Sequence, residues 1–174
     1  MKPVETDSGP GSYSRLAAQL AALLEGERDP IANAANTAAL LFTNLPELNW
    51  AGFYFARAGG ELVLGPFQGR PACTRIAPGR GVCGAAARAR KTLVVDDVHV
   101  FPDHIACDAA SRSEIVVPLI GADPGRELIG VLDLDSPRTS RFNDEDRLGL
   151  ERIARIYLDS IELHSIGHGQ IGRG

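Results

Sequence analysis

The N-terminal part of the chain has the hydrophobic pattern of two helices. Leucine and alanine recur at helical spacing over residues 13–25, and Gly26 follows as a stop. A second helix is predicted to begin at Asp29 and Pro30, because an acidic N-cap followed by proline suits a first turn. Its alanine-rich sequence runs to Pro46, which favours close packing against a neighbouring element.

Two further helices are predicted farther along the chain. The glycine-rich turn at residues 79–84 leads into a short helix over residues 85–91. Near the C-terminus, Asn143 is the expected N-cap of a helix over residues 144–164, which is acidic in its first turn and apolar at helical spacing. Both ends of the chain are therefore predicted to be helical.

The middle of the chain has the short apolar runs and turn residues of β-strands. Extended segments are predicted at residues 50–55, 61–64, 67–69, 74–76, 93–95, 115–120 and 127–135. In the last segment, strict alternation places Asp133 and Asp135 on one face of the sheet, together with Val131. Leu132 and Leu134 then lie on the opposite face.

A loop of about eighteen residues, 96–113, separates two of these strands. Loops of this length in a compact domain are usually functional or disordered, and apolar residues such as Val100, Phe101 and Ile105 favour function. Helices at both ends of a run of antiparallel strands predict an α+β fold, with the helices collected on one side of one sheet.

Composition and charge narrow the class of protein. The hydrophobic fraction of 44% and the charged fraction of 23% are typical of a soluble globular protein. The net charge of −4, without a basic run, argues against a partner nucleic acid or an anionic membrane surface. The chain contains no apolar stretch of bilayer length and no apolar signal core, so we expect a cytoplasmic protein. No linker divides the sequence. We expect a flexible leader at residues 1–12, one domain at 13–166 and a flexible tail at 167–174.

Three cysteines, Cys73, Cys83 and Cys107, are the first candidates for chemistry. Cys107 follows His104 in the long loop, where exposure and a nearby imidazole favour the reactive thiolate. Cys83 lies where the glycine-rich turn becomes a helix, whose free N–H groups would stabilise a thiolate, although tight packing of small residues explains the same pattern. An odd number of cysteines without a secretion signal argues against a structural disulfide framework.

Metal ligation by these cysteines and by the loop residues His99 and His104 gains no support. The cysteines lie ten and twenty-four positions apart without a C-x-x-C pair, which does not match the common zinc spacings. The sequence also has no Walker loop and no strand-linked G-x-G-x-x-G motif, so nucleotide phosphate binding is not indicated.

Acidic residues within apolar strands predict a polar pocket. Glu114 directly precedes one apolar strand, and Asp133 and Asp135 interrupt the next. Buried charges are costly unless they are paired or line a site, so this grouping favours a pocket over a solvated surface. Such carboxylates would bind a hard cation, bind an ammonium group, or supply a proton when crowding raises a pKa. Trp50 and Tyr54 face one side of a strand and would form an aromatic wall or part of the core.

Eight segments of the sequence occur in a characteristic order: NWAGFYF, ELVLGPFQG, PACTRI, GRGVCG, DVHVFPDHIACD, SEIVVPLI, LIGVLDLDSP and RFNDEDRLGLE. Together, over residues 13–158, they resemble the free methionine-(R)-sulfoxide reductases, a family built on a GAF domain. The resemblance is specific, because other GAF domains share the sheet and helices but not three cysteines in these surroundings.

What the resemblance implies is a single GAF-like α+β domain, with a six-stranded antiparallel sheet, helices packed on one face and a small enclosed pocket on the other. Members of the family reduce the R epimer of free methionine sulfoxide by thiol chemistry, without a metal or an organic cofactor. Thioredoxin restores them by reducing a redox-active disulfide. They are commonly homodimers.

The resemblance also assigns roles to the thiols. Cys107 matches the nucleophile, which would attack the sulfoxide sulfur and be left as a sulfenic acid. Cys73 and Cys83 match the two other cysteines of the family, one of which resolves the sulfenic acid as a disulfide. Cys73 is favoured as the partner, and the resemblance leaves the pairing open.

Glu114, Asp133 and Asp135 match the pocket carboxylates of the family, and Trp50 and Tyr54 match its aromatic wall. A sulfoxide oxygen leaves only after protonation, and a carboxyl crowded by others holds a proton near neutral pH; Glu114 is our choice for this acid. The other carboxylates would bind the substrate ammonium, and Trp50 would contact its methyl end. Two alternatives stay open: a GAF ligand sensor without catalysis, and a cysteine redox switch that reduces no substrate.

Overall fold

The computed structural model describes residues 12–102, 109–122, 125 and 127–162. The helices are α1 (Ser12–Leu23), α2 (Pro30–Asn44), α3 (Gly81–Ala89) and α4 (Asp144–Ser160). The strands are β1 (Trp50–Ala56), β2 (Leu62–Gly69), β3 (Arg75–Ile76), β4 (Leu93–Val95), β5 (Ser113–Ile120) and β6 (Leu128–Ser136), with short 3-10 helices η1 (Ala58–Gly60) and η2 (Val98–Val100). None of the helices in the described ranges is both long and apolar enough to cross a membrane.

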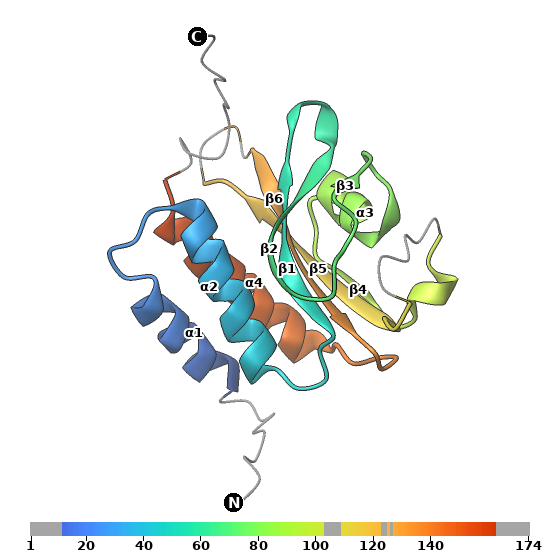
Figure 1. Ribbon diagram of the computed structural model, residues 1–174, viewed down its shortest axis with the longest axis horizontal. Helices are drawn as coiled ribbons and strands as arrows, with labels where there is room; N and C mark the ends of the chain where they lie inside the picture. The colour runs from blue at the N-terminus through green and yellow to red at the C-terminus, as the bar shows by residue number, and fades with distance from the viewer. Residues whose placement is uncertain (1–11, 103–108, 123–124, 126, 163–174) are drawn as a thin grey trace, which may run out of the picture.

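The six strands form one sheet in the order β3-β2-β1-β6-β5-β4, and all neighbouring strands run antiparallel (Figure 1). The central strands are β1 and β6, whose side chains are covered on both faces. This architecture confirms the predicted α+β class and the six-stranded antiparallel sheet.

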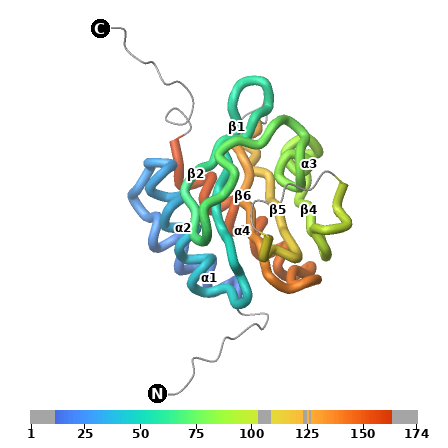
Figure 2. The backbone as a smooth tube through the Cα atoms, turned by 45° about the vertical axis from the view of Figure 1, so that its right-hand side comes forward, coloured from blue at the N-terminus to red at the C-terminus, as the bar shows by residue number. Residues whose placement is uncertain are grey.

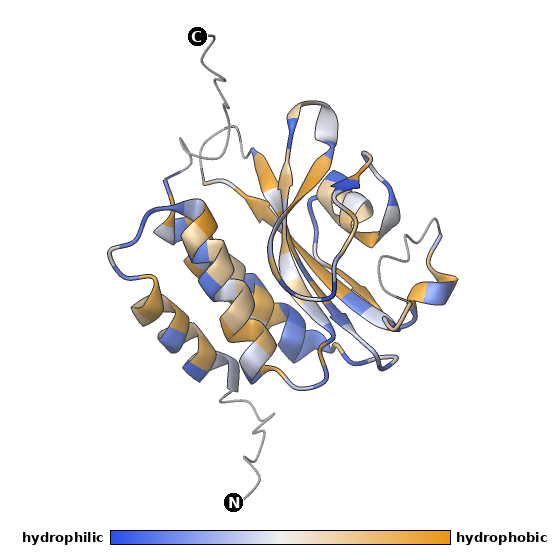
Figure 3. Ribbon diagram, in the orientation of Figure 1, coloured by the Kyte–Doolittle hydropathy of each residue, from blue (hydrophilic) through white to orange (hydrophobic). Residues whose placement is uncertain are grey.

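The helices cover the two faces of the sheet unequally. Helices α1, α2 and α4 lie together on one face, as predicted, whereas α3 lies on the opposite face (Figures 1 and 2). The face under the three helices is the main apolar core, in which Phe53, Leu132, Leu134 and Tyr157 are fully buried. Figure 3 shows mostly hydrophobic residues along α2, and polar residues interleaved with hydrophobic ones along α4.

The predicted helix caps are present. The Asp29 side chain accepts hydrogen bonds from the N–H groups of Ile31 and Ala32 at the start of α2. At the start of α4, Asn143 accepts from the Asp146 N–H group, and the Asp146 carboxylate accepts from the Asn143 N–H group. This reciprocal capping box satisfies N–H groups that have no acceptor within a helix.

One strand differs from its prediction. Residues 61–64 and 67–69 were expected as separate extended segments, because Gly65 and Pro66 lie between them. They form the single strand β2, and the register with β1 shifts by one residue at this point, so that Gly65 and Pro66 lie opposite Phe53. Proline cannot donate a backbone hydrogen bond, and a bulge lets a strand continue past it.

The long loop is shorter than predicted. Its last predicted residue, Ser113, already belongs to β5, and η2 forms within it. The part of the loop that contains His104 and Cys107 lies outside the described residues. Residues 1–11 of the predicted leader and the whole predicted tail, 167–174, also lie outside them.

Candidate active site

A pocket lies between α3 and the face of the sheet opposite the three-helix layer. Its walls include all five residues that the sequence predicted for a pocket, together with one cysteine: Trp50, Tyr54, Cys83, Glu114, Asp133 and Asp135. The structure therefore brings together side chains from β1, α3, β5 and β6.

Strand register explains why these side chains meet. Asp135 of β6 pairs with Trp50 of β1 on one side and with Glu114 of β5 on the other. Asp133 lies two residues along β6 and Tyr54 four residues along β1, so both point to the same face as their neighbours. Strand alternation therefore collects the three acids and two aromatic rings on one face.

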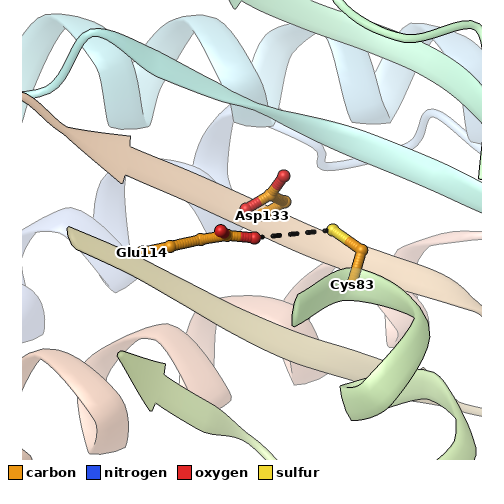
Figure 4. A group of neighbouring side chains, drawn as sticks. All are labelled: Cys83, Glu114 and Asp133. Carbon is orange, nitrogen blue, oxygen red and sulfur yellow. Dashed lines mark hydrogen bonds between the residues drawn. The ribbon is translucent and has the colours of Figure 1, made fainter. Parts of the chain in front are cut away.

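Helix α3 brings Cys83 onto this acidic face. Cys83 lies in the first turn of α3, and its Sγ atom is 3.9 Å from Oε1 of Glu114 (Figure 4). Ligand atoms of Cys83, Glu114 and Asp133 all lie within 4.8 Å of one another. The three residues are only 4%, 6% and 6% exposed, respectively.

Burial keeps protons on the carboxyl groups of this cluster. Loss of hydration raises the pKa of Glu114 well above its ordinary value, and the nearby Asp133 and Asp135 raise it further. Burial also raises the pKa of Asp133, to about 7, although hydrogen bonds from Cys83 and Glu114 oppose the shift. Two such close carboxyls titrate as a pair, so the cluster retains a proton near neutral pH.

Cys83 is a protonated thiol. Burial is the main cause that raises its pKa well above the ordinary value, and the negative charges of Asp133 and Glu114 add to it. Of the two explanations that the sequence offered for Cys83, tight packing agrees with the burial of the first turn of α3, and stabilisation of a thiolate does not, although the helix does begin there. Dehydration and two facing acids outweigh the helix dipole.

The aromatic wall depends on a glycine in β1. The Trp50 ring stacks on Tyr54 and on Phe67, with ring centroids 5.8 and 5.4 Å apart. Gly52 lies between Trp50 and Tyr54 on the same face, and a β-carbon there would be 2.7 Å from the Trp50 ring and 2.4 Å from Cβ of Phe67. Only glycine lets the indole lie this close to the strand.

The same two aromatic side chains also bind the segment that follows β2. Trp50 Nε1–H donates to the Arg70 carbonyl at 3.2 Å, and the Tyr54 hydroxyl donates to the Cys73 carbonyl at 3.1 Å. Between these two anchors, Pro71 and Ala72 line the pocket. Residue pattern alone gave no indication of these two hydrogen bonds, because both join residues nineteen or twenty positions apart.

The two cysteines that the structure describes have different states. Cys73 is half-buried and disulfide-bonded, whereas Cys83 is a free, buried thiol. Cys107, the predicted nucleophile, lies outside the described residues. The structure therefore distinguishes the two other cysteines, which the sequence left as alternatives.

The start of α3 offers hydrogen-bond donors to the pocket. Arg80, Gly81 and Val82 line it, and the first hydrogen bond of the helix runs from Gly84 N–H to the Arg80 carbonyl. The N–H groups of Gly81, Val82 and Cys83 have no acceptor in the part of the chain that the structure describes. Arg80 was not among the residues predicted for the pocket. It lies in a glycine-rich turn before a helix, a pattern that is typical of anion sites and could have indicated it.

A metal ion is the other chemistry that this cluster admits. A thiol sulfur and carboxylate oxygens at such spacing are able to share a divalent cation. His99, one of the histidines weighed for zinc, instead binds Asp97 at the surface in η2, with Nδ1 and Oδ1 2.9 Å apart. The expectation that the protein needs no metal stays a prediction.

The fold and the pocket define the class of protein. A family model described as GAF domain matches residues 15–157, which is most of the chain. The six-stranded antiparallel sheet, with the pocket between it and α3, is thus the framework of a GAF domain.

The most informative similarities are to reductases on this framework. The free methionine-R-sulfoxide reductase of Escherichia coli is 51% identical over 81% of this chain and 83% of its own length. The fRMsr of Staphylococcus aureus, solved in its reduced form, matches with a TM-score of 0.80 at 51% identity, covering 85% of this chain and 94% of that one. The free methionine-R-sulfoxide reductase of Neisseria meningitidis, solved with its substrate, gives 0.82 at 47% identity over 87% and 89%. The chain belongs to the free methionine-R-sulfoxide reductase family of GAF domains.

Proposed function

We propose that this protein reduces free L-methionine-(R)-sulfoxide to L-methionine. The Cys107 thiol attacks the sulfoxide sulfur, and the oxygen is transferred to the cysteine, which leaves methionine and a Cys107 sulfenic acid. The Cys73 thiol then attacks that sulfenic acid, so that a disulfide forms and one water molecule leaves. A dithiol reductant restores both thiols by disulfide exchange.

The observation that carries the proposal is a pocket whose carboxyl groups keep a proton near neutral pH. A sulfoxide oxygen must be protonated before the S–O bond breaks, and Glu114 has the strongly raised pKa that this step requires. Asp133, which shares the cluster, is able to return the proton. In this proposal, Glu114 on the GAF sheet is the acid that protonates the oxygen of the bound sulfoxide.

Recognition of a free amino acid follows from the charges around the pocket. Oδ1 of Asp133 is buried and has no hydrogen-bond partner among the described residues, so it is available to the substrate ammonium group, with Asp135 beside it. The free N–H groups at the start of α3, with Arg80, suit the substrate carboxylate. A methionine sulfoxide within a peptide lacks both charges, so we expect the pocket to reject it.

The methyl end of the substrate is assigned to the aromatic wall. Trp50 is nearly fully buried and stacks on Tyr54 and Phe67, so its side chain is a rigid apolar part of the pocket wall. A sulfur–methyl group packs favourably against such a ring. Trp50 therefore fixes which end of the substrate lies deepest.

The state of the cysteines supports Cys73 as the resolving residue. Cys73 is disulfide-bonded, whereas Cys83 is free, buried and protonated, which makes it a poor nucleophile. The role proposed for Cys83 is to contribute its thiol to the hydrogen-bonded cluster with Glu114.

The remaining assignments concern partners and location. We assign thioredoxin as the reductant, no metal or organic cofactor, a homodimer as the assembly, and the cytoplasm as the compartment. Thioredoxin suits a half-exposed disulfide at Cys73, since exchange needs access to the sulfur. Metal analysis of the purified protein and its sedimentation velocity test the cofactor and dimer assignments.

A thioredoxin-coupled assay tests the function. NADPH consumption is followed with free L-methionine-(R)-sulfoxide as substrate, and with the S epimer and an N-acetylated peptide sulfoxide as controls. Turnover of the R epimer alone, abolished in Cys107→Ser, is the expected result. A parallel assay with dithiothreitol separates a failure of thioredoxin from a failure of the enzyme.

The same assay distinguishes the alternatives. Tight binding of methionine sulfoxide without release of methionine in either reductant would indicate a ligand sensor. A disulfide that forms with peroxide but never with methionine sulfoxide would indicate a redox switch. Either result would contradict the proposed reductase.

A further inference from the structure

We propose that Tyr54 and Trp50 are positioning residues for the second chemical step, in which Cys73 resolves the sulfenic acid. This inference rests on the proposed function, because it concerns the thiol chemistry of the same pocket. It adds a role to two side chains that were assigned only to the pocket wall.

The geometry is that of a clamp on a short segment. Chain segment 70–73 follows β2, and the chain pairs with β2 again directly after it, where the Leu64 N–H group donates to the Thr74 carbonyl. The Trp50 indole N–H holds the first carbonyl of the segment, and the Tyr54 hydroxyl holds the last, which belongs to Cys73 itself. Both donors come from β1, at the centre of the sheet.

The clamp is rigid because its donors are rigid. Trp50 and Tyr54 are 3% and 2% exposed, and the ring stack with Phe67 fixes both side chains. At the start of the segment, Gly69 has a φ of +123°, and a β-carbon there would be 2.8 Å from the Trp50 ring. A side chain at residue 69 would therefore clash with the Trp50 ring, and glycine lets the turn pack directly against it.

Burial keeps the Tyr54 hydroxyl a donor. It raises the pKa of Tyr54 above its ordinary value, and Asp133 adds to the shift, so this hydroxyl stays protonated. Hydrogen bonds from Tyr54 and Trp50 thus satisfy two carbonyl groups in a segment that has no regular secondary structure.

The consequence is a link between substrate binding and disulfide formation. The side chains of Trp50 and Tyr54 line the pocket in which methionine sulfoxide would bind, while their polar groups hold the carbonyls of Arg70 and Cys73. Because its backbone is held in one place, the Cys73 thiol does not have to sample many positions before the disulfide forms. Fixed geometry of this kind accelerates a reaction between two groups. The sulfenic acid is then short-lived and escapes further oxidation.

A single-turnover experiment with Tyr54→Phe tests this role. The variant keeps the ring and loses only the hydroxyl. Without added reductant, methionine release reports the first step, and loss of the dimedone-reactive sulfenic acid reports the second. We expect resolution to slow by about fivefold, the effect of one lost hydrogen bond, while methionine release changes less.

Tyr157→Phe is the matched control. The Tyr157 hydroxyl also donates to a carbonyl, that of Pro30, at 3.1 Å, but on the opposite face of the sheet. We expect this variant to lose comparable stability and to resolve its sulfenic acid at the wild-type rate. Equal slowing in both variants would overturn the positioning role, because it would show a general effect of stability.

A peroxide arm separates this inference from the proposed function. Hydrogen peroxide converts the nucleophilic thiolate to a sulfenic acid and releases hydroxide, so resolution is measured without methionine sulfoxide. Slower resolution in Tyr54→Phe supports the clamp even if methionine sulfoxide is not a substrate. A wild-type rate in Tyr54→Phe overturns it, whatever the substrate is.

Discussion

Both faces of the central sheet have an apolar core, but only the face under α3 also carries a cluster of buried acidic side chains, although the same strands build both. In β6, Leu132 and Leu134 face helices α1, α2 and α4 and are fully buried in the apolar core. Their neighbours Asp133 and Asp135 face α3 and line the pocket. Alternate residues of one strand therefore serve two purposes, of which the first stabilises the fold and the second costs stability.

The cost follows from the shifted pKa values. Dehydrated carboxyl groups at Glu114 and Asp133 are less stable as charged groups than they would be in the unfolded chain. A fold tolerates such groups because the opposite face supplies the apolar burial. The comparison predicts that substitutions on the two faces will change different properties.

The largest effect is expected on the polar face. Glu114→Gln keeps the size of the side chain and removes the proton that it would donate. We expect kcat to fall by about 10²–10⁴-fold, the usual contribution of a general acid, with the melting temperature unchanged or higher. Steady-state kinetics and thermal unfolding of the same preparation check both parts.

Glu151→Gln is the control for that change. Glu151 lies on α4, where it accepts a hydrogen bond from Thr92 and faces Arg147. We expect a wild-type kcat. A rate in Glu114→Gln within a few-fold of wild type would remove Glu114 from the acid role.

The apolar face should give the opposite result. Leu134→Ala leaves a cavity under the three helices, and we expect a loss of about 2–5 kcal/mol in the free energy of unfolding. Activity per folded molecule should change little, because Leu134 points away from the pocket. Denaturant unfolding and an assay at low temperature make the measurement; a large fall in kcat without a loss of stability would contradict the division between faces.

The pH dependence of stability should depend on the polar face. Since Asp133 has a pKa of about 7 when folded and a lower one when unfolded, the folded chain binds more protons between the two values. Stability contributed by this group is therefore complete at low pH and is lost as the pH rises toward 7. Unfolding by urea across this range should show a decline that is weaker in Asp133→Asn; parallel curves would show that Asp133 does not hold its proton.

The smallest effect is expected at the start of α4, outside the residues that line the pocket. Asn143→Ala removes the cap that accepts from two N–H groups, and we expect a loss of about 1 kcal/mol in the free energy of unfolding. Activity per folded molecule should stay at the wild-type value. Thermal and urea unfolding measure this change, and an unchanged stability would mean that the capping box contributes nothing.

Much of this division was predictable from the sequence. Strict alternation in β6 gave the faces of Leu132 and Asp133, and caps gave the starts of α2 and α4. These are local signals, in which the spacing of side chains alone decides the structure. The break expected at Gly65 and Pro66 was wrong because a bulge, set by the partner strand, carries β2 past the proline.

Properties that depend on distant contacts were not predictable in the same way. The pKa of Cys83 follows from its contact with Glu114 and Asp133, which only the packing of α3 on the sheet produces. The clamp from Tyr54 to the Cys73 carbonyl likewise joins strand β1 to a segment nineteen residues away in the sequence. The start of a helix favours a thiolate only where water and positive charge lie near the sulfur. The sequence of residues 79–84 alone does not show whether either is present.

The most direct test of the two-face account is a carbon-13 NMR titration of the Glu114 carboxyl group, assigned by its absence in Glu114→Gln. The account predicts that the resonance still reports a protonated carboxyl near neutral pH and titrates well above the ordinary glutamate value. A midpoint at the ordinary value would contradict it, because Glu114 would then be ionised near neutral pH and would not be the acid for the sulfoxide oxygen.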